Sequence, residues 1–120
     1  MLSAFVNSGY ETLKDPFLRA SYLLELNGWK MRDVLIRRAD FLEMILDKQQ
    51  VLSSNDATFE EKNQILEECS RELNRLQQSF AKAFENERYA ECMDVLVEWK
   101  YWRSLQSIAD RWAAQGKGIE

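Results

Sequence analysis

Helix-breaking residues are scarce in this chain, and their scarcity constrains its fold more than any other feature. The 120 residues contain one proline and four glycines. A sheet protein needs many tight turns, which these two residues usually form, whereas long helices need few of them. Hydrophobic residues make up 46% of the chain and charged residues 30%, which suits a globular protein. The sequence therefore predicts an all-α domain with one core.

Capping signals and apolar spacing divide the chain into helical segments. Asp15-Pro16 ends one segment, because the residue before proline disfavours the helical region, and starts the next with Asp15 as N-cap. Asn27-Gly28 then supplies a C-terminal stop. A connection over residues 28–38 follows. The five predicted segments cover about residues 3–14, 16–27, 39–53, 58–86 and 88–115.

The last three segments have the pattern of a helical bundle. Thr58 and Glu61 form a capping box at the start of the fourth segment, Asn86 and Glu87 form a short turn, and the fifth segment should stop before Gly116. Long helices joined by short polar turns predict an antiparallel three-helix bundle, preceded by the first two segments. The fourth segment carries apolar residues three or four positions apart: Leu66, Cys69, Leu73, Leu76, Phe80 and Ala83.

The apolar face of the fifth segment changes along its length. At about 100° per residue, the set after residue 100 is rotated by about half a turn from the set before it. We expect the second half to pack on the first two segments, with Tyr101 at the switch as an interface anchor. The two sets are Tyr89, Cys92, Met93, Leu96 and Trp99, and then Tyr101, Trp102, Leu105, Ile108 and Trp112.

Catalytic chemistry and cofactor binding find little support in the sequence. The chain has no histidine, which excludes Ser-His-Asp sites, Cys-His sites and the HExxH zinc motif. It also lacks the glycine-rich loops that bind phosphates. Cys69 and Cys92 are expected to be buried free thiols rather than a disulfide or metal ligands. We therefore expect no enzyme activity, no cofactor and no metal.

Charge and hydropathy also narrow the range of partners. The net charge of −4 comes without a basic stripe, which argues against nucleic acid. No run of 18 apolar residues is present, so no membrane span is expected. The N-terminus has the character of neither a secretory signal nor a transit peptide.

The third segment carries more apolar residues than one core-facing stripe needs. Leu42 and Leu46 lie one turn apart at the side of the core face, and Asp47 and Gln50 lie further round. This arrangement is either a docking ridge for a partner or a wider buried face, and periodicity does not separate the two. The core face itself consists of Phe41, Met44, Ile45 and Leu52.

Three strings resemble HscB-type co-chaperones of iron–sulfur cluster assembly. Residues 7–24, NSGYETLKDPFLRASYLL, are similar to the end of the J-domain and the start of the C-terminal domain. Residues 40–47, DFLEMILD, resemble the opening of the family's scaffold-binding helix, and residues 89–102, YAECMDVLVEWKYW, resemble the last helix of mitochondrial members. The resemblance implies a J-domain remnant with a connecting helix over residues 1–27 and a scaffold-binding bundle over residues 28–120.

The resemblance also implies a mechanism. In this family the bundle binds an iron–sulfur scaffold of the IscU type, and the J-domain delivers it to a DnaK-type chaperone and stimulates that chaperone's ATPase. The family's binding positions fall on Leu42, Leu46 and Tyr101, with Asp47 and Gln50 at the acidic positions. Gln50 replaces an acid here, and Glu43, close by, replaces an apolar residue. The last-helix string implies the mitochondrial matrix, with bacterial cytoplasm as the alternative.

One family element is absent from these 120 residues. The J-domain stimulates the chaperone through a His-Pro-Asp tripeptide, and the chain has no histidine. A truncated reading of the gene, an excised domain and a genuine J-less protein all fit this pattern. The alternative function is a structural bundle that self-associates, in which Leu42, Leu46 and Tyr101 would meet a copy of themselves.

Overall fold

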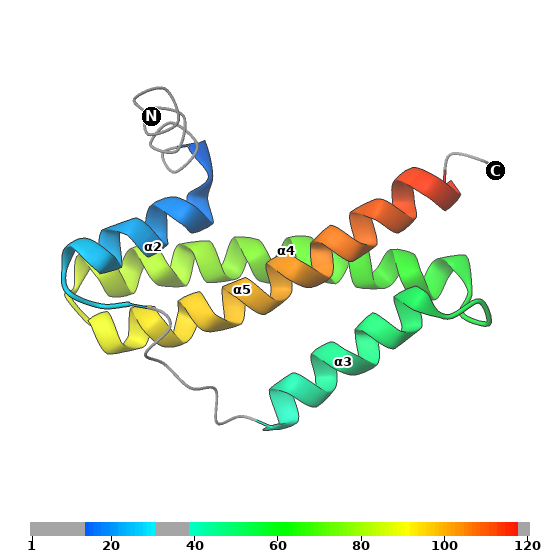
Figure 1. The fold of residues 1–120 in the computed structure, drawn as a ribbon, viewed down its shortest axis with the longest axis horizontal. Coiled ribbons are helices and arrows are strands. Elements are labelled where there is room, and N and C mark those ends of the chain that lie inside the picture. The colour runs from blue at the N-terminus through cyan, green and yellow to red at the C-terminus, as the bar shows by residue number, and fades with distance from the viewer. Residues whose placement is uncertain (1–13, 31–38, 118–120) are drawn as a thin grey trace, which may run out of the picture. The chain divides into compact units, whose positions relative to one another are not determined.

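The computed structural model describes residues 14–30 and 39–117, and every regular element in these ranges is helical (Figure 1). The helices are α2 (Pro16–Leu26), α3 (Ala39–Ser53), α4 (Phe59–Glu85) and α5 (Tyr89–Trp112), followed by a short π-helix, η2 (Ala113–Lys117). The predicted all-α class is confirmed, and the helices from residue 16 to residue 112 lie within about three residues of their predicted bounds. The predicted first helix lies outside the described residues except for Lys14, and so do Met31 and Val34 of the connection.

The predicted caps of α2 are confirmed. The Asp15 carboxylate accepts hydrogen bonds from the backbone N–H groups of Phe17 (2.9 Å) and Leu18 (3.3 Å). At the other end Gly28 has a φ of +84°, which glycine adopts without a steric penalty. Its N–H and that of Trp29 bond back to the last turn of the helix, which satisfies carbonyls that would otherwise lack a partner.

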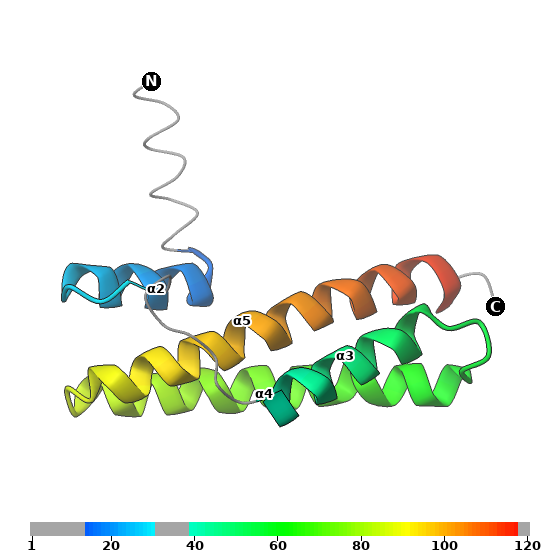
Figure 2. The same cartoon turned by 60° about the horizontal axis from the view of Figure 1, so that its bottom comes forward.

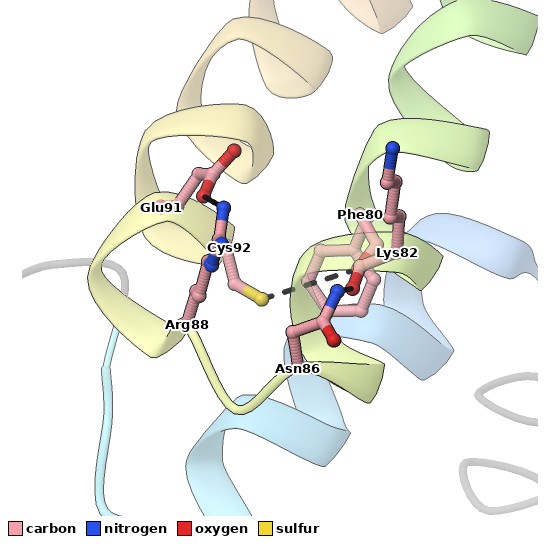
Figure 3. A network of polar contacts seen from close by, with 6 residues as sticks. All are labelled: Phe80, Lys82, Asn86, Arg88, Glu91 and Cys92. Atoms are coloured by element: carbon pink, nitrogen blue, oxygen red, sulfur yellow. Dashed lines mark hydrogen bonds and ion pairs between the residues drawn. The ribbon is translucent and has the colours of Figure 1, made fainter.

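The turn between α4 and α5 uses the same capping geometry without a glycine. Glu87 has a φ of +59°, and the Arg88 N–H reaches the Ala83 carbonyl at 2.9 Å. Around this turn the Asn86 side chain donates to the Lys82 carbonyl at 2.9 Å, and the Cys92 thiol donates to the Phe80 carbonyl at 4.0 Å (Figure 3). Arg88 and Glu91 form an ion pair at 3.7 Å (Figure 3).

The described helices form two compact units. Helices α4 and α5 are each divided between them, with one segment in each unit. The first unit contains α2 with Leu76–Trp99. Within it the Phe17 ring meets Trp99 edge-on at 5.6 Å, and Trp99 meets Phe80 at 6.2 Å. The α5 segment of this unit is buried over about 200° of its circumference at 100° per residue. Its buried side chains are Cys92, Met93, Val95, Leu96, Val97 and Trp99.

The second unit contains α3, the part of α4 up to Arg75, and α5 from Lys100 onwards. These segments form the predicted antiparallel three-helix arrangement, and α3 runs alongside the other two in Figures 1 and 2. The Phe41 ring packs on Tyr101 at 6.3 Å, and Phe59 packs on Trp112 at 5.4 Å. The core consists of Phe41, Ile45, Leu52, Ile65, Cys69, Trp102, Leu105 and Ala109.

The structure bears on two expectations about α5. Within the second unit its second half packs on α3 and α4, because Tyr101 contacts Phe41 of α3 and Trp112 contacts Phe59 of α4. The expected packing of this half on the first two segments stays a prediction. The expected stop before Gly116 is wrong, because the helical backbone continues through this residue as a π-helix that reaches Lys117. Glycine weakens a helix without forbidding one.

Both cysteines are buried and free, as predicted. Burial raises the pKa of the Cys69 thiol to about 12, with Glu68 adding to the shift. Burial also raises the pKa of Cys92. A buried thiol with a raised pKa is a poor nucleophile, so these residues act as small apolar side chains. The predicted division between residues 1–27 and 28–120 stays a prediction.

Candidate partner-binding surface

Helix α3 presents an apolar side chain to solvent beside its buried face. Phe41, Ile45 and Leu52 are buried in the second unit. Leu46 is 57% exposed, although it directly follows the buried Ile45. The exposed fraction changes this much between adjacent residues because neighbouring side chains on a helix point about 100° apart. Leu46 therefore does not belong to a wider buried face.

The other predicted residues of this surface lie along the same helix. Leu42, one turn before Leu46, is half-buried, and Gln50, one turn after it, is exposed. Asp47 is exposed and lies next to Leu46 in sequence. Leucine, leucine and glutamine at positions i, i+4 and i+8 form a line along one side of α3, with the Asp47 carboxylate beside it. We call these four residues together with Tyr101 the α3 ridge.

Tyr101 joins the α3 ridge from another helix. Its half-buried ring meets Phe41 of α3 edge-to-face, with an interplanar angle of 86°. Phe41 directly precedes Leu42, so this contact places Tyr101 near the N-terminal end of the ridge. A tyrosine with one side packed and the other accessible suits an interface, because its ring gains area and its hydroxyl stays available for hydrogen bonding.

The structure adds residues of α4 that sequence reasoning did not connect with this surface. Lys48 of α3 forms an ion pair with Glu68 of α4 at 2.6 Å. Asp47 and Lys48 line a groove that Glu61 and Ile65 of α4 border from the other side. The helical spacing of Glu61, Ile65 and Glu68 was visible in the sequence, but nothing there showed that this side of α4 faces α3.

Other functional chemistry is sparse in the parts of the chain that the structure describes. Within residues 14–30 and 39–117, no group of three or more histidine, cysteine, aspartate or glutamate side chains is arranged to hold a metal ion. None of the described helices is both long and apolar enough to span a membrane. The α3 ridge is thus the main candidate site among the described residues.

Comparison with known proteins identifies the family. Residues 37–110 match the family described as the HSCB C-terminal oligomerisation domain, and this range includes the whole α3 ridge. The chain belongs to the HscB C-terminal domain family. This match confirms the resemblance to HscB-type iron–sulfur cluster co-chaperones that we inferred from the three sequence strings. Co-chaperones of this family are generally not enzymes.

A curated relative and a solved structure agree with this assignment. The mitochondrial J-type co-chaperone JAC1 of Saccharomyces cerevisiae is 29% identical over 126 residues, which cover 98% of this chain and 67% of JAC1. The solved structure of the Jac1 co-chaperone from the same organism superposes with a TM-score of 0.81 at 23% identity, covering 93% of this chain and 78% of the solved chain. The similarity to Jac1 therefore spans nearly all of this chain.

Proposed function

We propose that this HscB-family chain binds an iron–sulfur scaffold protein of the IscU type through the α3 ridge. The observation that carries the proposal is the 57% exposure of Leu46 on a helix whose neighbouring face is buried. Leu42, Leu46 and Tyr101 would be covered by the scaffold and exclude water from the contact. Asp47 and Gln50 would lie at the rim, where Asp47 steers a basic surface and Gln50 donates or accepts hydrogen bonds.

The co-chaperone role adds a second partner. In HscB-type co-chaperones that carry a J-domain, that domain would pass the bound scaffold to a DnaK-type chaperone and stimulate its ATPase. These 120 residues contain no histidine, so the His-Pro-Asp tripeptide is not among them. On this basis the present chain binds scaffold without activating the chaperone. We place it in the mitochondrial matrix, on the support of the mitochondrial relative.

Isothermal titration with an IscU-type scaffold tests the proposal. The unmodified chain should bind saturably, and a Leu42→Ala/Leu46→Ala/Tyr101→Ala variant that keeps its helical circular dichroism should not. Tyr22→Ala is a matched control, because Tyr22 is a large side chain of α2 with 49% exposure, outside the ridge. The control should bind like the unmodified chain. Absence of binding by the unmodified chain would overturn the proposal.

Self-association is the second candidate function, and the family's description as an oligomerisation domain favours it. In that case Leu42, Leu46 and Tyr101 would be covered by a second copy of the chain. Sedimentation equilibrium separates the two functions. A dimer that the triple alanine variant converts to a monomer, without affinity for scaffold, would support self-association. A monomer that binds scaffold would support the co-chaperone function.

A further inference from the structure

A groove of about 240 Å³ lies between α3 and α4 within the second unit. Val51 and Ile65, respectively half-buried and buried, are its apolar residues. The α3 side and the α4 side each contribute positions one helical turn apart, so the groove follows both helices. Its full lining is Asp47, Lys48, Val51, Glu61, Gln64, Ile65 and Glu68.

The charges around this groove are unbalanced. Asp47, Glu61 and Glu68 bring three carboxylates against the single ammonium group of Lys48. Lys48 is already engaged, because its Nζ lies 2.6 Å from a Glu68 carboxylate oxygen. Asp47 and Glu61 form no ion pair with any residue in the described ranges. The Glu61 carboxylate accepts a hydrogen bond from the Thr58 hydroxyl at 3.2 Å, which leaves it able to accept further bonds.

An apolar floor between carboxylates suits one kind of side chain. Lysine and arginine place their methylene stems on apolar surface while their charged ends reach polar groups. A stem lying on Val51 and Ile65 would bring the cation to the Asp47 and Glu61 carboxylates, where charge-assisted hydrogen bonds are strong. A neutral or acidic side chain would leave these carboxylates without a counter-charge.

The position of the groove indicates which molecule supplies that side chain. Asp47 borders the groove and also belongs to the α3 ridge, and Leu46 precedes it. A partner that covers the α3 ridge as far as Asp47 therefore reaches the edge of the groove. A second copy is a poor occupant, because the chain carries a net charge of −4 and would bring like charges together.

We propose that the groove between α3 and α4 receives a lysine or arginine side chain of the partner protein that binds the α3 ridge. The inference rests on the proposed scaffold-binding function and adds Glu61 and Glu68 of α4 to its binding surface. Glu61 and Asp47 contact the cation, and the Lys48–Glu68 ion pair keeps the remaining carboxylate in place. The groove thereby selects for a basic residue at one position of the scaffold.

A matched pair of substitutions tests this inference by titration with an IscU-type scaffold. Glu61→Gln removes a charge from the groove and keeps the acceptor for Thr58. Glu60→Gln is the control, because Glu60 is also exposed and also lies in the first turn of α4, but does not line the groove. Both substitutions change the net charge and the helix-terminus charge equally.

At low ionic strength Glu61→Gln should raise the Kd by about 1.5- to 5-fold, the range for one exposed ion pair, and Glu60→Gln should leave it unchanged. The difference should shrink in high salt, because exposed charges are screened. Equal Kd values for the two variants would overturn the groove inference. If Leu46→Ala still weakened binding in that case, the scaffold-binding function would stand without the groove. No binding by the unmodified chain would overturn both.

Discussion

Replacing Leu46 with alanine separates binding from folding on a single helix. Leu46 is 57% exposed, so it contributes little to the core and has most of its surface left for a partner to cover. Leu52, six residues further along α3, is 5% exposed. The same chemical change at these two positions should therefore act on different equilibria. Leu46→Ala should weaken scaffold binding, and Leu52→Ala should weaken the fold.

The sizes of both effects follow from burial. Full burial of a leucine side chain stabilises by about 1.5–3 kcal/mol. Covering the 57% of Leu46 that is exposed would thus contribute about 0.9–1.7 kcal/mol. Alanine keeps about a quarter of the side-chain carbons, so the expected loss is about 0.7–1.3 kcal/mol, or a three- to ten-fold higher Kd. Leu52→Ala should instead cost about 2–5 kcal/mol of folding free energy, because it leaves a cavity.

Two assays on the same samples measure these quantities. Isothermal titration with an IscU-type scaffold gives the Kd, and urea unfolding followed by circular dichroism gives the free energy of unfolding. Leu46→Ala should change the free energy of unfolding by no more than about 0.5 kcal/mol. An unchanged Kd for Leu46→Ala would show that no partner covers this leucine. A loss of stability as large as that of Leu52→Ala would show that Leu46 belongs to the core.

Four further substitutions test the local structure, each by urea unfolding. Glu87→Gly should stabilise the chain by about 0.5–1 kcal/mol, because glycine adopts the φ of +59° without strain. Gly28→Ala should cost about 1 kcal/mol through its φ of +84° alone, since no atom lies within 4 Å of the added Cβ. Asp15→Ala should cost about 1 kcal/mol, because two backbone N–H groups lose their acceptor. The Cys69 pKa is about 12 in the folded chain, above its ordinary value of 9.0, so the thiol ionises at a lower pH in the unfolded chain than in the folded one. The free energy of unfolding should therefore fall as the pH rises between these two values. Cys69→Ala should remove that fall, and a decline that persisted in this variant would have another source.

The helices themselves were predictable because their signals are local. Asp15 before Pro16, the Thr58–Glu61 capping box and Asn27-Gly28 each act within one turn, and the structure shows the expected bonds at all three. Gly116 misled the prediction for the opposite reason. The residue is compatible with a helical turn as well as with a stop, and only the rest of the fold decides between them.

Packing between segments distant in sequence was less predictable. The change of apolar face in α5 showed that this helix touches two sets of residues, but it did not show that Phe41 and Phe59 belong to the second set. The candidate site divides in the same way. Periodicity placed Leu46 beside the core face of one helix, but only the structure shows that it is exposed. The groove needs Asp47 and Glu61 from two helices, and only their packing brings these carboxylates to one place.

The α3 ridge and the groove would contribute to binding in different ways. The α3 ridge would provide apolar area from two leucines of α3 and from Tyr101 of α5, which would favour binding without specifying much about the partner. On the proposal above, the groove would add a charge requirement across two helices and reject partners that lack a basic side chain at the matching position. A partner that binds both the α3 ridge and the groove must present an apolar patch and a cationic side chain at a fixed distance from each other. Losing the ridge should therefore reduce affinity for every scaffold, whereas losing the groove carboxylate should reduce the preference for scaffolds that carry the basic residue.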